Sequence, residues 1–257
     1  MKTSAKTWAK VAVGAALAGG VCVGEFAMAA EIKIFTSMGS LSGVTDLAAA
    51  YEKASGHKVV VAARIGPALP KALASNEPGD IIANFTNTFD GLIKQGKVAP
   101  GSVLEFARAG VGVAIRKGAP KPNIGTVEAY RETMLKAKSI GYSKSGSGLI
   151  AERGFKQLGI FDQVKDKVRY LEGTPVAVFV AKGEVELGMQ QSNAIVPVEG
   201  ADYAGPLPGD LQEYIYFSVG LLNISSQPEA ARAFMQFMAS PAAAAHLRKS
   251  TMEPPKG

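Results

Sequence analysis

The segment EIKIFTSMGS, residues 31–40, decides how the fold begins. Its first half alternates polar and apolar residues, which is typical of a β-strand, and its second half is a cluster of hydroxyl and glycine residues. Residues 44–54 then carry apolar side chains at helical spacing, and Gly56 follows as a residue type that commonly ends helices. A strand, a polar loop and a helix in this order predict the opening unit of an α/β protein.

Short apolar runs and helical segments continue to alternate along the chain, which predicts an α/β fold. The expected strands are residues 32–35, 58–62, 80–84, 110–115, 139–142, 168–171, 186–190 and 216–222. Helices fill the gaps, and Ser226 with Glu229 is predicted to form a capping box. No linker rich in Pro, Gly and Ser cuts the 257-residue chain once. If two lobes exist, the chain therefore crosses between them more than once.

Residues 1–30 have the pattern of a cleavable secretory signal. A basic segment with three lysines precedes an apolar run, and Ala27 and Ala29 fit the small-x-small motif for cleavage near Ala29 or Ala30. Cys22 allows a lipoprotein signal as the alternative, but the residues before it lack the leucine-rich consensus. No later segment has the roughly 18 consecutive apolar residues of a spanning helix. We expect a periplasmic protein that does not insert into the membrane after signal cleavage.

The expected mature chain excludes several classes of function. Removal of residues 1–30 lowers the net charge from +6 to +4 and leaves no cysteine, no tryptophan and two distant histidines, His57 and His246. Zinc and thiol chemistry are therefore not expected, and neither is any other metal or cofactor. The small excess of interspersed positive charge suits an anionic small molecule and does not predict a nucleic-acid partner.

Three strand exits share one chemical character. Residues 36–40, 64–68 and 143–148 are small, polar or rich in glycine, and each precedes a predicted helix. Strand carboxyl ends and helix N-termini meet at the ligand edge of an open α/β sheet, where free N–H groups bind oxyanions. The alternative for each loop is simple helix capping. Likewise Arg64 is either a solvated charge or a bidentate partner for an anion, and Gln191 is either solvated or a ligand contact.

Four segments carry a resemblance to a known family. EIKIFTSMGSLSGVTDLAAAYEKASGHKVVV, RIGPALPKALASNEPGDIIANF, DGLIKQGKVAPGSV and FMQFMASPAAAAHLRK resemble the type II periplasmic substrate-binding proteins of the molybdate-binding kind. The resemblance covers nearly the whole expected mature chain. It implies a monomer with two α/β lobes, joined by two crossing strands, that closes over a small anion and delivers it to an ABC transporter. The first lobe would comprise residues 31–109 and 216–257, and the second residues 110–215.

The resemblance also implies where the ligand binds. Nine predicted ligand contacts lie in the three loops: Ser37, Met38, Gly39, Ser40, Arg64, Gly66, Ser145, Ser147 and Gly148. Two more lie later in the chain, at Thr174 and Gln191. The chain departs from the molybdate pattern at three places. Ser-Met-Gly-Ser replaces Ala-Ser-Leu-Thr in the first loop, Arg64 and its neighbours replace a serine cluster, and Gln191 replaces a tyrosine. The expected ligand is therefore either an organic carboxylate or an inorganic oxyanion.

The same group of proteins includes aconitate isomerase, so an enzyme that shifts an allylic proton on a tricarboxylate is the alternative function. Such an enzyme needs a general base within reach of the substrate carbon. With both histidines expected on the surface, the groups considered are Tyr142, Lys144, Arg64 and a serine, and the sequence identifies none of them as the base.

Overall fold

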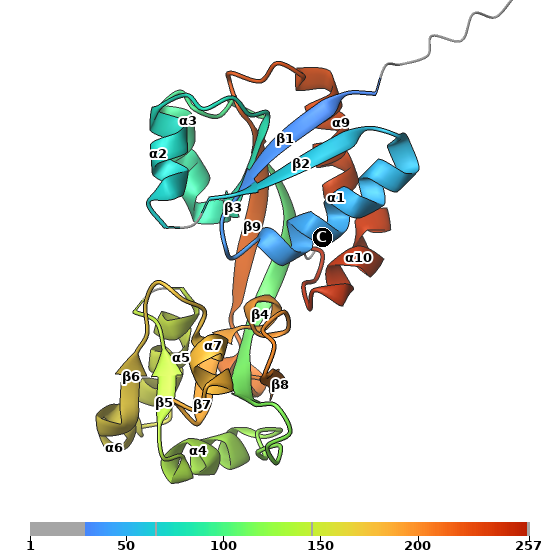
Figure 1. The fold of residues 1–257 in the computed structure, drawn as a ribbon. Helices are drawn as coiled ribbons and strands as arrows, with labels where there is room; N and C mark the ends of the chain where they lie inside the picture. Colours follow the sequence, from blue (N-terminus) through green and yellow to red (C-terminus); the bar gives the residue numbers. More distant parts are fainter. Residues whose placement is uncertain (1–28, 65, 145, 256–257) are drawn as a thin grey trace, which may run out of the picture.

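The computed structural model describes residues 29–64, 66–144 and 146–255. Most of the predicted signal segment and the candidate Ser145 lie outside these residues. The chain forms two α/β lobes, and two long strands, β4 (Leu104–Arg116) and β9 (Tyr214–Leu221), run between them (Figure 1). Within the described ranges no helix has the length and apolar character that crossing a membrane requires.

The first lobe is built on a sheet with the strand order β2-β1-β3-β9-β4. Strands β2, β1 and β3 are parallel, and β9 is antiparallel to β3. Before the chain crosses, its elements are β1 (Glu31–Thr36), α1 (Leu41–Ser55), β2 (Lys58–Ala63), α2 (Ala68–Ala74), β3 (Ile81–Phe85), the 3-10 turn η1 (Thr86–Thr88) and α3 (Phe89–Lys94). After β9 they are α9 (Pro228–Met238), η4 (Pro241–Ala243) and α10 (Ala244–Lys249).

The second lobe contains everything between the two crossing strands. Its sheet has the order β4-β7-β5-β6, and β8 pairs with the other edge of β4. Its elements are α4 (Val127–Lys136), β5 (Ile140–Tyr142), α5 (Ser147–Gln157), α6 (Phe161–Val164), η2 (Lys165–Lys167), β6 (Val168–Tyr170), α7 (Val176–Ala181), β7 (Leu187–Gln191), α8 (Ser192–Ile195), β8 (Ala201–Pro206) and η3 (Gly209–Leu211).

Strand β4 belongs to both sheets. Its residues 104–110 pair with β9 in the first sheet, whereas residues 111–114 pair with β7 in the second. The change of partner falls between Gly110 and Val111, next to the predicted division after residue 109. Because one continuous strand carries both hydrogen-bond ladders, the two sheets are joined directly at this point.

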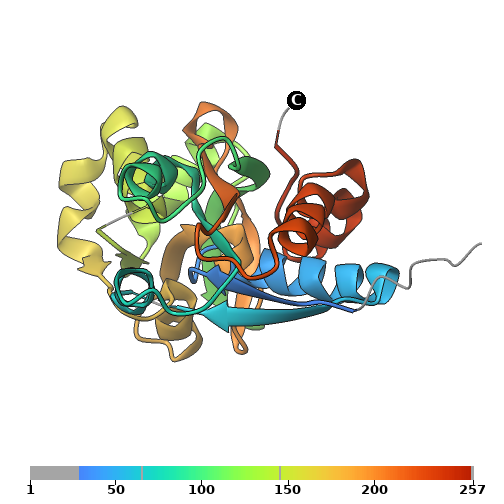
Figure 2. The same cartoon turned by 90° about the horizontal axis from the view of Figure 1, so that it is seen from above.

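Helices cover both faces of the first sheet. Ile34 of β1 faces the cluster formed with α1, α9 and α10, whereas its neighbour Phe35 faces the cluster formed with α2 and α3. Figure 2 shows this division from above, with α1, α9 and α10 on one side and α2 and α3 on the other. Successive strand residues point to opposite faces, so β1 needs apolar residues at both positions. The apolar face predicted for α1 is confirmed, since Val44, Leu47 and Tyr51 are buried there.

All eight predicted strands are present, with two differences. Strand β4 begins at Leu104 rather than near residue 110, because Glu105 and Arg108 interrupt the apolar pattern that sequence reasoning follows. Strand β8 was not predicted, since it contains Gly205 and Pro206, which are unfavourable in central strands. As an edge strand paired only with β4 among the described strands, it tolerates both residues.

The predicted capping box at Ser226 is wrong. Helix α9 begins after Gln227, and the side chain that accepts hydrogen bonds from the N–H groups before it is that of Asp80, 147 residues earlier, just before β3. Asp80 is 4% exposed, and its Oδ1 accepts hydrogen bonds from the Ser225 hydroxyl at 2.7 Å and from the Ser226 and Gln227 N–H groups at 3.1 and 3.2 Å. A carboxylate can accept more hydrogen bonds than a serine hydroxyl. The long-range contact with Asp80 therefore takes the place of the predicted Ser226–Glu229 capping box.

Replacement of Asp80 by alanine should destabilise the protein, because the N–H groups of Ser226 and Gln227 before α9 lose the acceptor that this buried carboxylate provides. We expect the free energy of unfolding to fall by about 2–3 kcal/mol, in line with the cost of leaving charged hydrogen bonds unmade. Urea denaturation followed by circular dichroism measures this change. Asp210→Ala, on the exposed turn η3, is the matched control and should change it by less than about 0.5 kcal/mol. Equal effects of the two variants would contradict the capping role.

Candidate functional site

A cavity of about 900 Å³ lies between the two lobes. Segments of both lobes at or after strand ends line it. The lining residues there are 38–39, 85–88, 143, 146–147, 149–150, 153, 171–174, 176, 190–191 and 194. Residue 105 of β4 and residues 213–216 at the start of β9 complete the lining. Strand carboxyl ends from two sheets therefore face one space, as the α/β rule for ligand sites leads one to expect. We refer to this space as the interlobe cavity.

The loop between β1 and α1 brings its backbone to the interlobe cavity. Met38 and Gly39 line it, while Ser40 is fully buried beneath them. The Ser40 hydroxyl lies 2.9 Å from the Thr36 hydroxyl, 3.2 Å from the Ser37 hydroxyl and 3.3 Å from the Ala83 carbonyl oxygen. These hydrogen bonds fix the loop from below, so the serines that made it resemble an oxyanion site act here chiefly to hold its shape.

Helix α5 brings its N-terminus to the same cavity from the second lobe. Gly146, the residue before the helix, has a φ of 50°, in the left-handed region that favours glycine. Gly146 and Ser147 line the cavity, and the first N–H groups of the helix have no partner within it. Such a helix end carries a partial positive charge that favours an anion.

Gly148 has a packing role instead. It lines neither the interlobe cavity nor the neighbouring one, and a Cβ atom added there would lie 1.7 Å from the Ser143 carbonyl oxygen. Only glycine lets the turn after β5 approach the first turn of α5 this closely.

Arg64 lies in an adjoining cavity of about 590 Å³ within the first lobe. This cavity is also lined by Ser37 and Gly66, and it shares Met38 and Gly39 with the interlobe cavity. The Arg64 guanidinium donates to both carboxylate oxygens of Glu77, and this contact is the main cause that holds the pKa of Glu77 below its usual range. Arg64 therefore already has a carboxylate partner from its own chain.

Charged groups that the sequence did not single out line the interlobe cavity. Arg153 of α5 forms a bidentate ion pair with Glu213, with N–O distances of 3.0 and 2.6 Å. Glu172 accepts a hydrogen bond from the Lys144 N–H at 2.8 Å. Glu105 of β4 is the third carboxylate, and partial burial raises its pKa, with Arg108 opposing that effect. Among the residues that line this cavity, Arg153 is the single Lys or Arg.

The structure brings most of the predicted contacts to the two cavities. Those that line the interlobe cavity are Met38, Gly39, Ser147, Thr174 and Gln191. Those that line the adjoining cavity are Ser37, Met38, Gly39, Arg64 and Gly66. Ser40 and Gly148 lie beneath these surfaces, and Ser145 lies outside the described residues. Sequence reasoning missed residues 86–88 after β3, although their Thr-Asn-Thr sequence follows the same strand-exit pattern. No sequence pattern could have identified Glu105, Arg153 or Tyr214.

Tyr142 and Lys144, two of the groups considered as a base, do not line the interlobe cavity. Tyr142 is fully buried, and burial is the main cause that raises its pKa. The Lys144 ammonium lies 4.7 Å from the centre of the Tyr170 ring. No cluster of three or more His, Cys, Asp or Glu residues is arranged to hold a metal ion in the part of the chain that the structure describes.

Contacts between the lobes close one edge of the interlobe cavity. Asn193 of α8 is 1% exposed, and its Nδ2 donates to the Gly39 carbonyl oxygen at 2.7 Å. The Ser42 hydroxyl of α1 donates to the Asn193 carbonyl oxygen at 3.3 Å. The loop before α1 is thus held by the second lobe as well as by its own serines.

Comparison with known proteins identifies the family. A family model described as a bacterial extracellular solute-binding protein matches residues 32–253. The chain belongs to this family. It is 34% identical over 229 residues to the aconitate isomerase of a Pseudomonas species, with 87% of each chain covered. It is 27% identical over 225 residues to the molybdate-binding protein of Azotobacter vinelandii, with 84% of this chain and 87% of that one covered.

Solved structures agree with the fold. The Azotobacter vinelandii periplasmic molybdate-binding protein matches with a TM-score of 0.70 at 19% identity, over 88% of this chain and 100% of that one. The two-lobed fold and the family resemblance inferred from the sequence are therefore confirmed.

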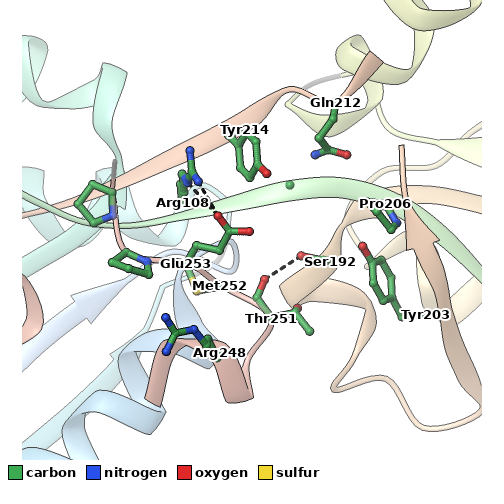
Figure 3. A pocket seen from close by; sticks show the side chains of 13 residues that line it. Arg108, Ser192, Tyr203, Pro206, Gln212, Tyr214, Arg248, Thr251, Met252 and Glu253 are labelled. Atoms are coloured by element: carbon green, nitrogen blue, oxygen red, sulfur yellow. Dashed lines mark hydrogen bonds and ion pairs between the residues drawn. The ribbon is translucent and has the colours of Figure 1, made fainter. Parts of the chain in front are cut away.

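This solute-binding protein has a third cavity, of about 640 Å³, beside the crossing strands (Figure 3). The C-terminal segment lies across it. The guanidinium of Arg108 donates to Glu253 Oε2 at 3.1 and 2.6 Å and stacks 4.1 Å from the centre of the Tyr214 ring, and the Ser192 hydroxyl of the second lobe donates to the Thr251 carbonyl oxygen at 3.0 Å. The C-terminal segment thus contacts both lobes where they join.

Gly148→Ala should destabilise this solute-binding protein, because the new methyl group overlaps the Ser143 carbonyl and the backbone must move. We expect a loss of about 1–3 kcal/mol in the free energy of unfolding, the usual cost of forced overpacking. Gly91→Ala in α3 is the control, since nothing lies within 4 Å of the added Cβ. That variant should be neutral or stabilising by up to about 1 kcal/mol. Chemical denaturation of both variants measures the difference, and an equally stable Gly148→Ala protein would rule out the packing role.

Proposed function

We propose that the protein captures a small organic anion with carboxylate groups in the interlobe cavity. The observation that carries this proposal is the convergence of three anion-binding features on one space. They are the backbone around Gly39, the N-terminus of α5 and the guanidinium of Arg153. The first belongs to one lobe and the other two to the second lobe, so a ligand that bridges them favours closure.

The charge pattern supports a carboxylate rather than a cation. Arg153 is held by Glu213 through a bidentate pair, which is the geometry that a ligand carboxylate also forms. Both side chains are about half exposed, at 55% and 46%, so exchange of Glu213 for a ligand carboxylate costs little packing. Arg153 then stays paired in the free and the bound protein.

The size of the space supports an organic ligand over an inorganic oxyanion. A volume of about 900 Å³ is within the roughly 300–1,000 Å³ of cavities that hold organic small molecules. A tetrahedral oxyanion fills only a small part of such a volume. The apolar side chains of Leu149, Ile150 and Val176 on its lining would contact the carbon skeleton of an organic anion.

The family and the sequence together support the cellular role. Export by the predicted signal would place the protein in the periplasm. The family resemblance implies that it acts there as a monomer. There it would deliver its ligand to the permease of an ABC transporter.

An isomerase is the second candidate function. It is favoured by the 34% identity to the Pseudomonas aconitate isomerase over 87% of both chains. On this reading the same cavity binds an unsaturated tricarboxylate and shifts an allylic proton.

Titration calorimetry with trans-aconitate, cis-aconitate, citrate, sulfate and molybdate tests the proposal. We expect binding of at least one tricarboxylate and weaker or no binding of the two inorganic anions. Arg153→Ala should weaken tricarboxylate binding at least tenfold, about 1.4 kcal/mol, because a charge-assisted hydrogen-bonding partner is lost. Arg64→Ala removes the same charge from the adjoining cavity, where Glu77 already holds it, and should weaken binding less than about threefold.

Two results would contradict the proposal. Binding of molybdate or sulfate without any tricarboxylate would make the ligand an inorganic oxyanion. A larger loss with Arg64→Ala than with Arg153→Ala would assign ligand binding to the adjoining cavity instead.

A further inference from the structure

We propose that Glu105 is the general base that moves a proton between two carbon atoms of a ligand in the interlobe cavity. This inference rests on the second candidate function, the isomerase, and assigns the general base of that reaction to Glu105. Glu105 lines the interlobe cavity from β4, on the first-lobe side, whereas α5 and Arg153 line it from the second lobe.

The backbone around Glu105 is irregular in a way that directs its side chain. Glu105 is opposite Ser218 in the ladder with β9, and the register shifts between Glu105 and Ala107. Such a β-bulge re-aims side chains and is frequent next to functional sites. Across the ladder, the Ser218 hydroxyl lies 2.8 Å from that of Thr86, which also lines the cavity.

Glu105 differs from the other two carboxylates of the cavity in its contacts. In the structure Glu213 is paired with Arg153, and Glu172 accepts the Lys144 N–H. The Glu105 carboxylate has no hydrogen bond or ion pair with any residue in the described ranges. Burial raises its pKa, and a carboxylate with a raised pKa is a stronger base. Perturbed carboxylates in clefts are frequent at catalytic sites.

The proposed step balances without a cofactor. The Glu105 carboxylate takes a proton from the methylene carbon of an unsaturated tricarboxylate, so that one C–H bond breaks and one O–H bond forms. The electron pair spreads over the allylic carbons and the conjugated carboxylate. Glu105 then returns the proton to the other end of the allylic system, and the double bond moves. Substrate and product have the same formula, and no group is oxidised or reduced.

The arrangement gives each group one task. Arg153 and the N-terminus of α5 would bind the carboxylates of the ligand from the second lobe, and Glu105 would approach its carbon atoms from the first lobe. The base and the anion-binding groups therefore meet across the same ligand when the lobes close.

Proton exchange provides the test. Wild-type protein is incubated with trans-aconitate in D₂O, and proton NMR follows loss of the methylene signal and appearance of cis-aconitate. We expect exchange and isomerisation by the wild type. Glu105→Gln should bind trans-aconitate within threefold of the wild type by calorimetry but exchange at least 100-fold more slowly. Glu128→Gln, an exposed substitution on α4, should behave as the wild type.

A second variant separates proton transfer from a loss of structure. Glu105→Ala should regain part of the exchange in proportion to added formate, because a small carboxylate can occupy the vacated space and act as the base. If the wild type binds trans-aconitate but neither exchanges its methylene protons nor forms cis-aconitate, the role of Glu105 is wrong while ligand capture stands. Exchange by Glu105→Gln within threefold of the wild type, or no formate effect on Glu105→Ala, also overturns it. Failure of all tricarboxylates to bind overturns the proposed function and this inference together.

Discussion

The hydrogen-bond ladders of β4 are the constraint on which the rest of the structure depends. One strand of 13 residues pairs with β9 in the first lobe and with β7 and β8 in the second. Because backbone hydrogen bonds continue through the change of partner at residues 110 and 111, the two sheets keep a fixed connection on one side. The ligand space lies in front of this connection, and the C-terminal segment with Glu253 covers its back.

The strand exits and the crossing strands contribute different groups to the lining of the interlobe cavity. Strand exits such as those before α1 and α5 supply backbone N–H groups, whereas the crossing strands supply Glu105, Tyr214 and Tyr216. Helix ends and crossing strands thus contribute different kinds of group to one space, and a fold of this kind can carry different functions through the side chains placed there.

Three arginines at the described cavities are paired with carboxylates of the same chain. An unpaired guanidinium or carboxylate in a partly closed space is costly, and this chain pairs Arg64 with Glu77, Arg108 with Glu253 and Arg153 with Glu213. The three pairs differ in location. The first lies in the adjoining cavity, the second in the cavity beside the crossing strands, and the third on the lining of the interlobe cavity.

The sequence by itself determined the α/β pattern, the approximate positions of eight of the nine described strands and the polar loops that follow three of them. These features follow from apolar periodicity and from glycine and hydroxyl residues at strand ends, which are local properties. Residues 36–40 are an example. The sequence predicts a polar loop at the end of this strand, but it does not predict that the Ser40 hydroxyl bonds to Thr36 and Ala83 beneath the loop. Only the tertiary structure decided the partners of charged residues. Asp80 caps a helix that begins about 150 residues later in the chain, Glu77 takes the arginine predicted for the ligand, and Glu105 reaches the cavity from a segment without a readable motif. Long-range pairs of this kind depend on which segments the fold brings together, and that information is not contained in any short stretch of sequence.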